Sequence, residues 1–218
     1  MAEMTRGIEI VKQQGNNSFS VTVGGERIST QGKALEVHLE KRQAYVYLVI
    51  DCSGSMAGYK LDQARQGAID FAADALRNGY RVGLIGFDTN ATHVCEPASD
   101  IQVLVPGVRA MKVGGSTNLA EAVRMGHDCL RRLEGARVMV IATDGQPDNP
   151  LAALKAARLA KDEGIEFITI GTDDANRRFL ERLATRKELG AKVAPDMFAR
   201  AIASASTLLP PPKRSGGR

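Results

Sequence analysis

The chain has 218 residues, a length that suits one α/β domain with additions, because a single core grows to roughly 250 residues before chains split into domains. Lys and Arg number 29 against 25 Asp and Glu, and three of the basic residues, Lys213, Arg214 and Arg218, lie in a terminal stretch without acids. The rest of the chain is therefore nearly neutral, which argues against a surface that binds nucleic acid.

The number and spacing of the cysteines, together with the N-terminal sequence, indicate the cellular compartment. Cys52, Cys95 and Cys129 are odd in number and lack metal-ligand spacing, so we expect buried thiols and neither a disulfide framework nor a zinc site. No apolar segment follows the charged N-terminus, and no window approaches the roughly 18 apolar residues that a membrane helix needs. We therefore expect a cytoplasmic protein without a membrane segment.

The first 42 residues form a predicted β-rich extension. Short alternating or β-branched runs indicate strands at residues 8–12, 19–23, 27–29 and 35–39, and the pair Gly24-Gly25 is typical of a two-residue hairpin turn. We expect either a small β appendage or strands that add to one edge of a larger sheet.

Strands and helices then alternate from residue 43 to residue 208. The patterns predict strands at 45–50, 81–87, 92–95, 138–142 and 165–170, and helices at 61–77, 119–133, 151–163, 177–184 and 196–208. This order predicts a doubly wound, mostly parallel, Rossmann-like sheet flanked by helices. Residues 209–218 are rich in Pro, Gly and basic residues and are predicted to form a disordered tail.

Oxygen-bearing side chains follow two of the buried strands. Asp51, Ser53 and Ser55 come directly after the strand at 45–50, Asp144 follows the strand at 138–142, and Thr117 follows a Gly-Gly pair between them. Open α/β sheets bind ligands at the carboxyl ends of their strands. Because every donor is a hard oxygen, the set favours Mg²⁺, Mn²⁺ or Ca²⁺ over zinc or copper.

Each fragment alone also fits a structural role. An Asp-x-Ser-x-Ser turn can cap the helix that follows it, and Thr-Asp-Gly is an ordinary turn sequence. Their joint occurrence, with both acids at the ends of buried strands, favours a metal site. No dinucleotide-binding or phosphate-binding glycine motif is present, and the histidines are scattered singly, so we predict neither catalytic nor cofactor-binding residues.

The five residues Asp51, Ser53, Ser55, Thr117 and Asp144 fill the pattern Asp-x-Ser-x-Ser, Thr, Asp. In this the chain resembles intracellular bacterial members of the von Willebrand factor A (VWA) domain family that have a complete metal-ion-dependent adhesion site (MIDAS). The resemblance implies that Ser53 and Ser55 bind the cation directly and that Asp51 and Asp144 supply charge. It also implies that Thr117 becomes a ligand when an Asp or Glu of a partner protein completes the site.

The resemblance further implies a non-enzymatic interaction module, working beside an ATPase of the MoxR or chelatase type or in a stress or defence system. The alternative is a magnesium-dependent phosphohydrolase built on the same kind of sheet. Such an enzyme needs a general acid or base beside the ion. Asp88 and Asp148 are the sequence's candidates for that role.

Overall fold

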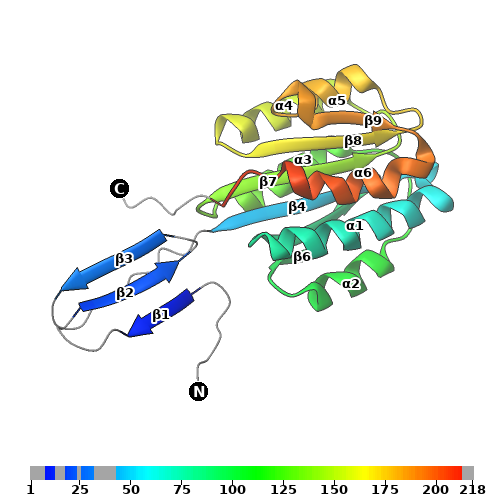
Figure 1. The fold of residues 1–218 in the computed structure, drawn as a ribbon. Coiled ribbons are helices and arrows are strands. Elements are labelled where there is room, and N and C mark those ends of the chain that lie inside the picture. The colour runs from blue at the N-terminus through cyan, green and yellow to red at the C-terminus, as the bar shows by residue number, and fades with distance from the viewer. Residues whose placement is uncertain (1–7, 13–17, 24–25, 32–42, 213–218) are drawn as a thin grey trace. The chain divides into compact units, whose positions relative to one another are not determined.

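The computed structural model describes residues 8–12, 18–23, 26–31 and 43–212, which fall into two compact units, 1–40 and 41–218 (Figure 1). The first unit contains a three-stranded antiparallel sheet in the order β1-β2-β3, with β1 at Ile8–Lys12, β2 at Ser18–Val23 and β3 at Glu26–Gln31. The predicted turn Gly24-Gly25, the predicted strand at 35–39 and most of the predicted tail, residues 213–218, lie outside the described residues.

The second unit is built on a six-stranded sheet in the order β6-β5-β4-β7-β8-β9. All neighbouring strands are parallel except β5 and β6, which pair antiparallel. The prediction of an α/β fold with a mostly parallel sheet is confirmed. The strands are β4 (Ala44–Asp51), β5 (Arg81–Phe87), β6 (Ala91–Ala98), β7 (Ala136–Thr143), β8 (Glu166–Thr172) and β9 (Gly190–Val193).

Helices cover both faces of this sheet (Figure 1). One face is covered by α1 (Tyr59–Arg77), α2 (Ile101–Ala110) and α6 (Phe198–Ser204), and the other by α3 (Leu119–Leu130), α4 (Pro150–Asp162) and α5 (Arg177–Leu183). The central strands are buried on both sides, which explains why β4 and β7 read as unbroken apolar runs. Short 3₁₀ segments lie at Gly54–Met56, Lys187–Leu189, Pro195–Met197 and Ala205–Leu208.

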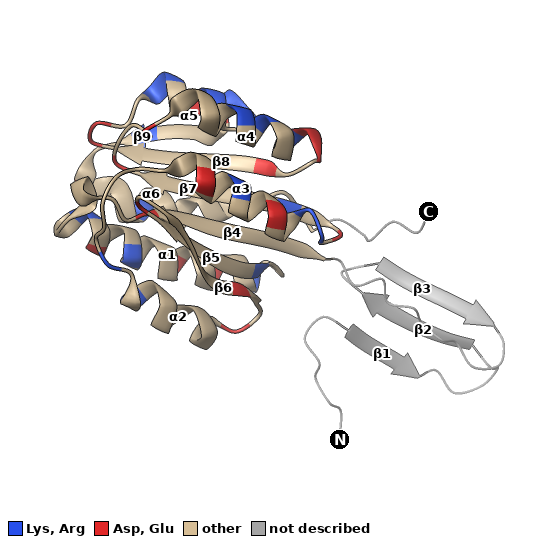
Figure 2. Ribbon diagram, turned by 180° about the vertical axis from the view of Figure 1, so that it is seen from behind, with Lys and Arg blue, Asp and Glu red and all other residues tan. Residues whose placement is uncertain are grey.

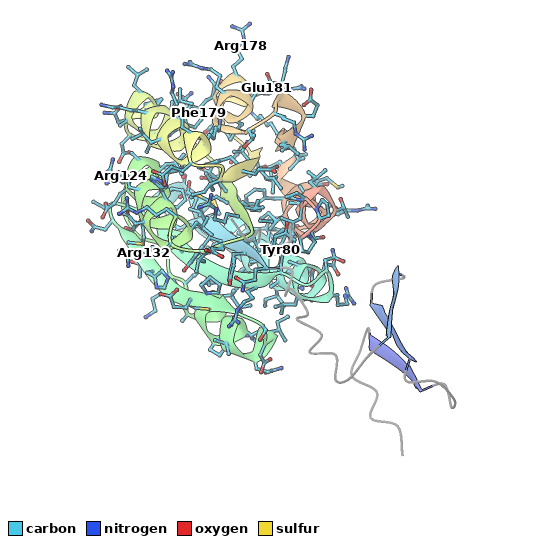
Figure 3. All side chains as sticks on the ribbon, turned by 90° about the vertical axis from the view of Figure 1, so that its left-hand side faces the viewer. Tyr80, Arg124, Arg132, Arg178, Phe179 and Glu181 are labelled. Atoms are coloured by element: carbon cyan, nitrogen blue, oxygen red, sulfur yellow. The ribbon has the colours of Figure 1, made fainter. Side chains whose placement is uncertain are left out.

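Charged side chains lie outside these layers. Arg124 of α3, Arg132 just beyond it and Arg178 of α5 are exposed on the helical surface (Figure 3). Basic and acidic segments are interspersed over the helices that cover the sheet (Figure 2). No helix in the described part of the chain has the length and apolarity required to cross a bilayer.

The sequence patterns did not indicate α2 and β9. Pro106 and Gly107 lie inside α2, where both residue types are unfavourable, although Asp100 caps the helix by accepting a hydrogen bond from the Gln102 amide at 2.9 Å. Strand β9 has only 4 residues and lies at the sheet edge.

The C-terminal segment contacts the domain beyond residue 208, where its composition predicts that the tail begins. The last predicted helix, 196–208, is observed as α6 with a 3₁₀ segment before it and another after it. Leu209 packs against the core, and the hydroxyl of Tyr80, labelled in Figure 3, donates to the Pro210 carbonyl at 2.5 Å.

Candidate metal centre

Strand β4 ends in a buried carboxylate, Asp51, whose exposed fraction is 0%. Its Oδ1 accepts a hydrogen bond from the Ser53 amide at 2.8 Å, and its Oδ2 accepts one from the Thr143 hydroxyl at 2.5 Å. Burial raises the pKa of Asp51 to about 6, and these two hydrogen bonds oppose that rise. The negative charge at this position is therefore incompletely compensated by the protein.

Hydroxyl groups connect Asp51's turn to the end of the neighbouring strand. Ser53 Oγ lies 3.1 Å from Ser55 Oγ, and Ser55 donates to Oδ1 of Asp144 at 2.8 Å. Because β4 and β7 are parallel neighbours, their carboxyl ends place Asp51 and Asp144 at the same edge. The structure thus brings four of the five predicted residues, Asp51, Ser53, Ser55 and Asp144, into one connected cluster.

Asp144 carries the second buried carboxylate, with an exposed fraction of 1%. Its Oδ2 has no directional hydrogen bond within the described residues, but the Lys60 ammonium lies 2.5 Å away as an ion pair. Lys60 also contacts Oδ2 of Asp173 at 2.8 Å. Burial lowers the pKa of Lys60, but its contacts with the two carboxylates outweigh that effect and raise the pKa above its usual value.

The loop 114–118 lies against the turn that follows β4. The Gly114 amide donates to the Cys52 carbonyl at 2.7 Å, and the Gly54 amide donates to the Gly115 carbonyl at 2.8 Å. Backbone hydrogen bonds of this kind fix the position of the loop that carries Thr117 relative to the Asp51 turn.

Thr117 itself is held by Asp148. The Thr117 amide donates to Asp148 Oδ1 at 3.1 Å, and the Asp148 amide donates to the Thr117 carbonyl at 3.0 Å. Thr117 is 9% exposed. Among the described contacts, none joins its hydroxyl directly to the other four predicted residues, so the structure places Thr117 beside the cluster without including it.

The two glycines before Thr117 permit close packing against the loop that follows β5. A Cβ atom at Gly114 would overlap the side chain of Asp88, and one at Gly115 would overlap the side chain of Thr89. The hydroxyl of Thr89 also accepts a hydrogen bond from the Ser116 amide at 3.1 Å. The Gly-Gly pair therefore allows close approach between the loops, and a larger residue at either position would force the side chain of Asp88 or Thr89 to move.

We refer to the turn 51–55 and the loops 114–118 and 143–148 together as the strand-end rim. Its donors are two buried carboxylates and three hydroxyls, and the described residues contain no cluster of three or more His, Cys, Asp or Glu suited to a metal ion. A cation here would rely on hydroxyl oxygens in addition to the carboxylates, which fits a hard divalent ion better than a thiolate- or imidazole-seeking one. The residues present are compatible with such an ion.

Several residues at the rim were not foreseen from the sequence. Thr143 was visible only as part of a Thr-Asp-Gly turn, and Asp148 only as a candidate acid. Lys60 and Asp173 gave no signal, because 113 residues separate them and each taken alone is an ordinary surface residue. Only the tertiary fold brings Asp173 to the Lys60 ammonium, which also pairs with Asp144.

Comparisons with known proteins agree with the fold. The model of the von Willebrand factor type A domain matches residues 46–202. A UPF0353 protein of Mycobacterium bovis is 29% identical over 163 residues, which are 66% of this chain and 48% of that protein. The chain thus spans about half the length of the curated relatives it matches.

Two solved structures illustrate the structural likeness. The vWF domain of the type V pili tip protein Mfa5 from Porphyromonas gingivalis has a TM-score of 0.68 at 15% identity, over 76% of this chain and 94% of that one. Proximal thread matrix protein 1 from the mussel byssus, solved with a zinc-occupied MIDAS motif, has a TM-score of 0.63 at 17% identity, over 81% of this chain and 48% of that one. At these identities the likeness establishes the fold alone.

Proposed function

Because the chain belongs to the von Willebrand factor type A domain family, we propose that it is a protein-interaction module that acts through a divalent cation at the strand-end rim. Domains of this family are commonly metal-dependent interaction modules. The proposed cation ligands are Asp51, Ser53, Ser55, Thr117 and Asp144, and Mg²⁺ is the proposed ion, with Mn²⁺ or Ca²⁺ as substitutes. The supporting observation is the buried pair of carboxylates, Asp51 and Asp144, joined through the Ser53 amide and the hydroxyls of Ser53 and Ser55.

The chemistry of the donor set supports an acidic partner. Two carboxylates balance the charge of a divalent ion, while the three hydroxyls are neutral and weak donors. When bound, the cation supplies an electrophilic position that an Asp or Glu side chain of a partner protein completes. Ser55 and Gly54 are exposed, so a partner can reach the rim from solvent.

A binding role is favoured over the phosphohydrolase alternative. The two acids that could serve as a general base both take part in loop hydrogen bonds: Asp88 Oδ1 accepts from the Asn90 amide at 3.0 Å, and Asp148 Oδ1 accepts from the Thr117 amide at 3.1 Å. Each of these contacts gives the carboxylate a role in ordering its own loop, which accounts for both acids without proton transfer. The proposed function is therefore non-catalytic.

We further propose that the protein acts in the cytoplasm, beside a MoxR- or chelatase-type ATPase or in a stress or defence system. The motivation is the family resemblance together with three free cysteines, Cys52, Cys95 and Cys129, which suit a reducing compartment. Fractionation of the native cells with an antibody against the chain tests this placement, and recovery in the secreted fraction would contradict it.

The domain organisation proposed is a β-rich extension at 1–42, the VWA domain at 43–208 and a tail at 209–218. We propose that the extension supplies a second contact surface or protects a sheet edge, since an uncovered edge strand invites pairing with other chains. Deletion of residues 1–40 tests this. Aggregation of the shortened chain would support edge protection, and a folded monomer that has lost its partner would support a contact surface. An unchanged melting temperature, monomeric state and partner binding would contradict both roles.

The central experiment is partner capture with Mg²⁺ or with a chelator, combined with calorimetric titration of Mg²⁺ and Mn²⁺ into the isolated chain. We expect capture only with the cation present, and we expect Thr117→Ala to weaken the partner more than it weakens the ion. Thr92→Ala, on the exposed side of β6, is the matched control and should change neither. Capture that persists in the chelator would contradict the proposed function.

A further inference from the structure

Lys60 occupies an unusual position for a cation. It is the second residue of α1, in the first turn, where the free amide groups and the helix dipole favour acidic side chains and disfavour basic ones. The residue before the helix, Gly58, is the N-cap and offers no side-chain acceptor to those amides. The ammonium group at this position therefore depends on the two carboxylates that it contacts, Asp144 and Asp173.

Asp173 is unusual as well. In the described part of the chain it is the single non-glycine residue with a positive φ, 51°. The left-handed region is unfavourable for L-residues, though Asp and Asn tolerate it better than most. Asp173 directly follows β8, a neighbour of β7, and its exposed carboxylate lies 2.8 Å from the Lys60 ammonium.

We propose that Lys60 is a built-in competitor of the divalent cation: its ammonium neutralises Asp144 when the cation is absent, and transfers fully to Asp173 when the cation binds. This inference rests on the proposed function, because it assumes that Asp144 serves a cation. It goes further in assigning roles to two residues outside the ligand set.

Charge arithmetic gives the reason for a transfer. A divalent cation beside Asp144 repels an ammonium at the same carboxylate twice as strongly as a monovalent ion would. The lysine side chain is flexible, and its ammonium already contacts Asp173. The ammonium can therefore leave Asp144 and remain paired with a carboxylate. Asp144, in turn, is never left as an unpaired buried charge, a state that costs considerable stability.

Four variants of the full chain test the competition by calorimetric titration with MgCl₂. Lys60→Met keeps a helix-forming side chain of similar length. This variant should bind Mg²⁺ about tenfold more tightly, because the ion no longer competes with the ammonium for Asp144. Asp173→Asn keeps a residue that tolerates positive φ and should bind roughly threefold more weakly, because Lys60 then has no second carboxylate. The double variant should match Lys60→Met, since Asp173 acts only through Lys60.

Lys155→Met is the control, because Lys155 is an exposed residue of α4 and its replacement changes the net charge by the same amount as Lys60→Met. It should leave Mg²⁺ affinity within about twofold of the original chain. A second readout is thermal melting: in chelator, Lys60→Met should melt below the original chain, and saturating Mg²⁺ should remove that difference.

The outcomes separate this inference from the proposed function. Mg²⁺ binding that is equal or weaker in Lys60→Met overturns the competition while leaving the metal centre intact. A double variant that binds more weakly than Lys60→Met by the same factor as Asp173→Asn alone overturns the transfer to Asp173, because that residue would then act on the ion directly. Absence of Mg²⁺ binding in the original chain and in Lys60→Met alike overturns the metal centre and this inference together.

Discussion

The two ends of the parallel sheet present different polar groups for pairing: helix carbonyls at one end and buried carboxylates at the other. At the end where strands begin, α1 and α4 each finish in a glycine with positive φ, Gly79 at 83° and Gly164 at 80°. The amides that follow turn back to the helices, from Tyr80 to the Ala75 carbonyl at 3.0 Å and from Ile165 to the Ala160 carbonyl at 3.1 Å. This is the Schellman arrangement, in which the last helical carbonyls are paired within the chain.

At the strand-end rim, the buried polar groups are acidic side chains at the ends of two neighbouring strands. Asp51 and Asp144 are buried carboxylates, and one oxygen of Asp144 has only the Lys60 ammonium near it within the described residues. Proteins tend to break local rules of stability where they act, and to obey them elsewhere. The difference between the two ends is therefore consistent with a fold-building role at the strand-start end and with the proposed binding role at the rim.

The largest expected effect comes from Asp51→Asn at the strand-end rim. Removal of one of two ligand charges should lower Mg²⁺ affinity by about 100-fold or more, measured by calorimetry. At pH 8 the carboxylate of Asp51 is charged although burial raises its pKa to about 6, so the neutral amide should leave the melting temperature in chelator unchanged or higher. Asp70→Asn, an exposed position on α1, is the charge-matched control. An Asp51→Asn chain that is unfolded would mean that Asp51 is a structural cap.

Adding or removing the cation gives the next effect. Mg²⁺ at 100 times its dissociation constant should stabilise the folded chain by about 2.7 kcal/mol, because it binds the folded state alone. Thermal melting with Mg²⁺ and with a chelator measures this. The same addition should leave Asp51→Asn unchanged, and an equal shift in both proteins would place the ion somewhere other than this rim.

Substitution at the opposite end should affect stability without affecting the metal. Gly164→Ala forces a side chain into positive φ, which costs about 1–2 kcal/mol of unfolding free energy. Chemical denaturation measures that loss, and calorimetry should show the original Mg²⁺ affinity. If Mg²⁺ affinity fell together with stability, the two ends would be energetically coupled and the contrast between them would be wrong.

The smallest effect is a pH dependence at the strand-start end. The contact with His127, whose Nε2 lies 3.0 Å from Oε2, holds the pKa of Glu163 below its usual value. Stability from a lowered carboxyl pKa is present above the unfolded value of about 4.5 and is lost as the pH falls through the folded value. The original chain should therefore melt slightly above Glu163→Gln at pH 6, and the difference should shrink toward pH 3. A difference that grows on acidification would contradict this.

Hydropathy periodicity predicted the strands and helices that have long apolar faces. It failed at α2, where Pro106 lies inside the helix, and at β9, an edge strand of 4 residues. The ligand residues could be proposed from the sequence because three of them lie within one five-residue turn, Asp51 to Ser55. The roles of Lys60 and Asp173 could not be proposed from the sequence, because they depend on a contact between residues that are 113 positions apart.

The loop 114–118, which carries Thr117, connects the turn after β4 to the N-termini of two helices. Backbone hydrogen bonds tie this loop to the β4 turn, and Thr117 is clamped by Asp148. The residue after Thr117, Asn118, caps α3, and the residue after Asp148, Asn149, caps α4. Thr117 is thus tied to the first turns of two helices that cover the same face of the sheet, α3 directly and α4 through Asp148.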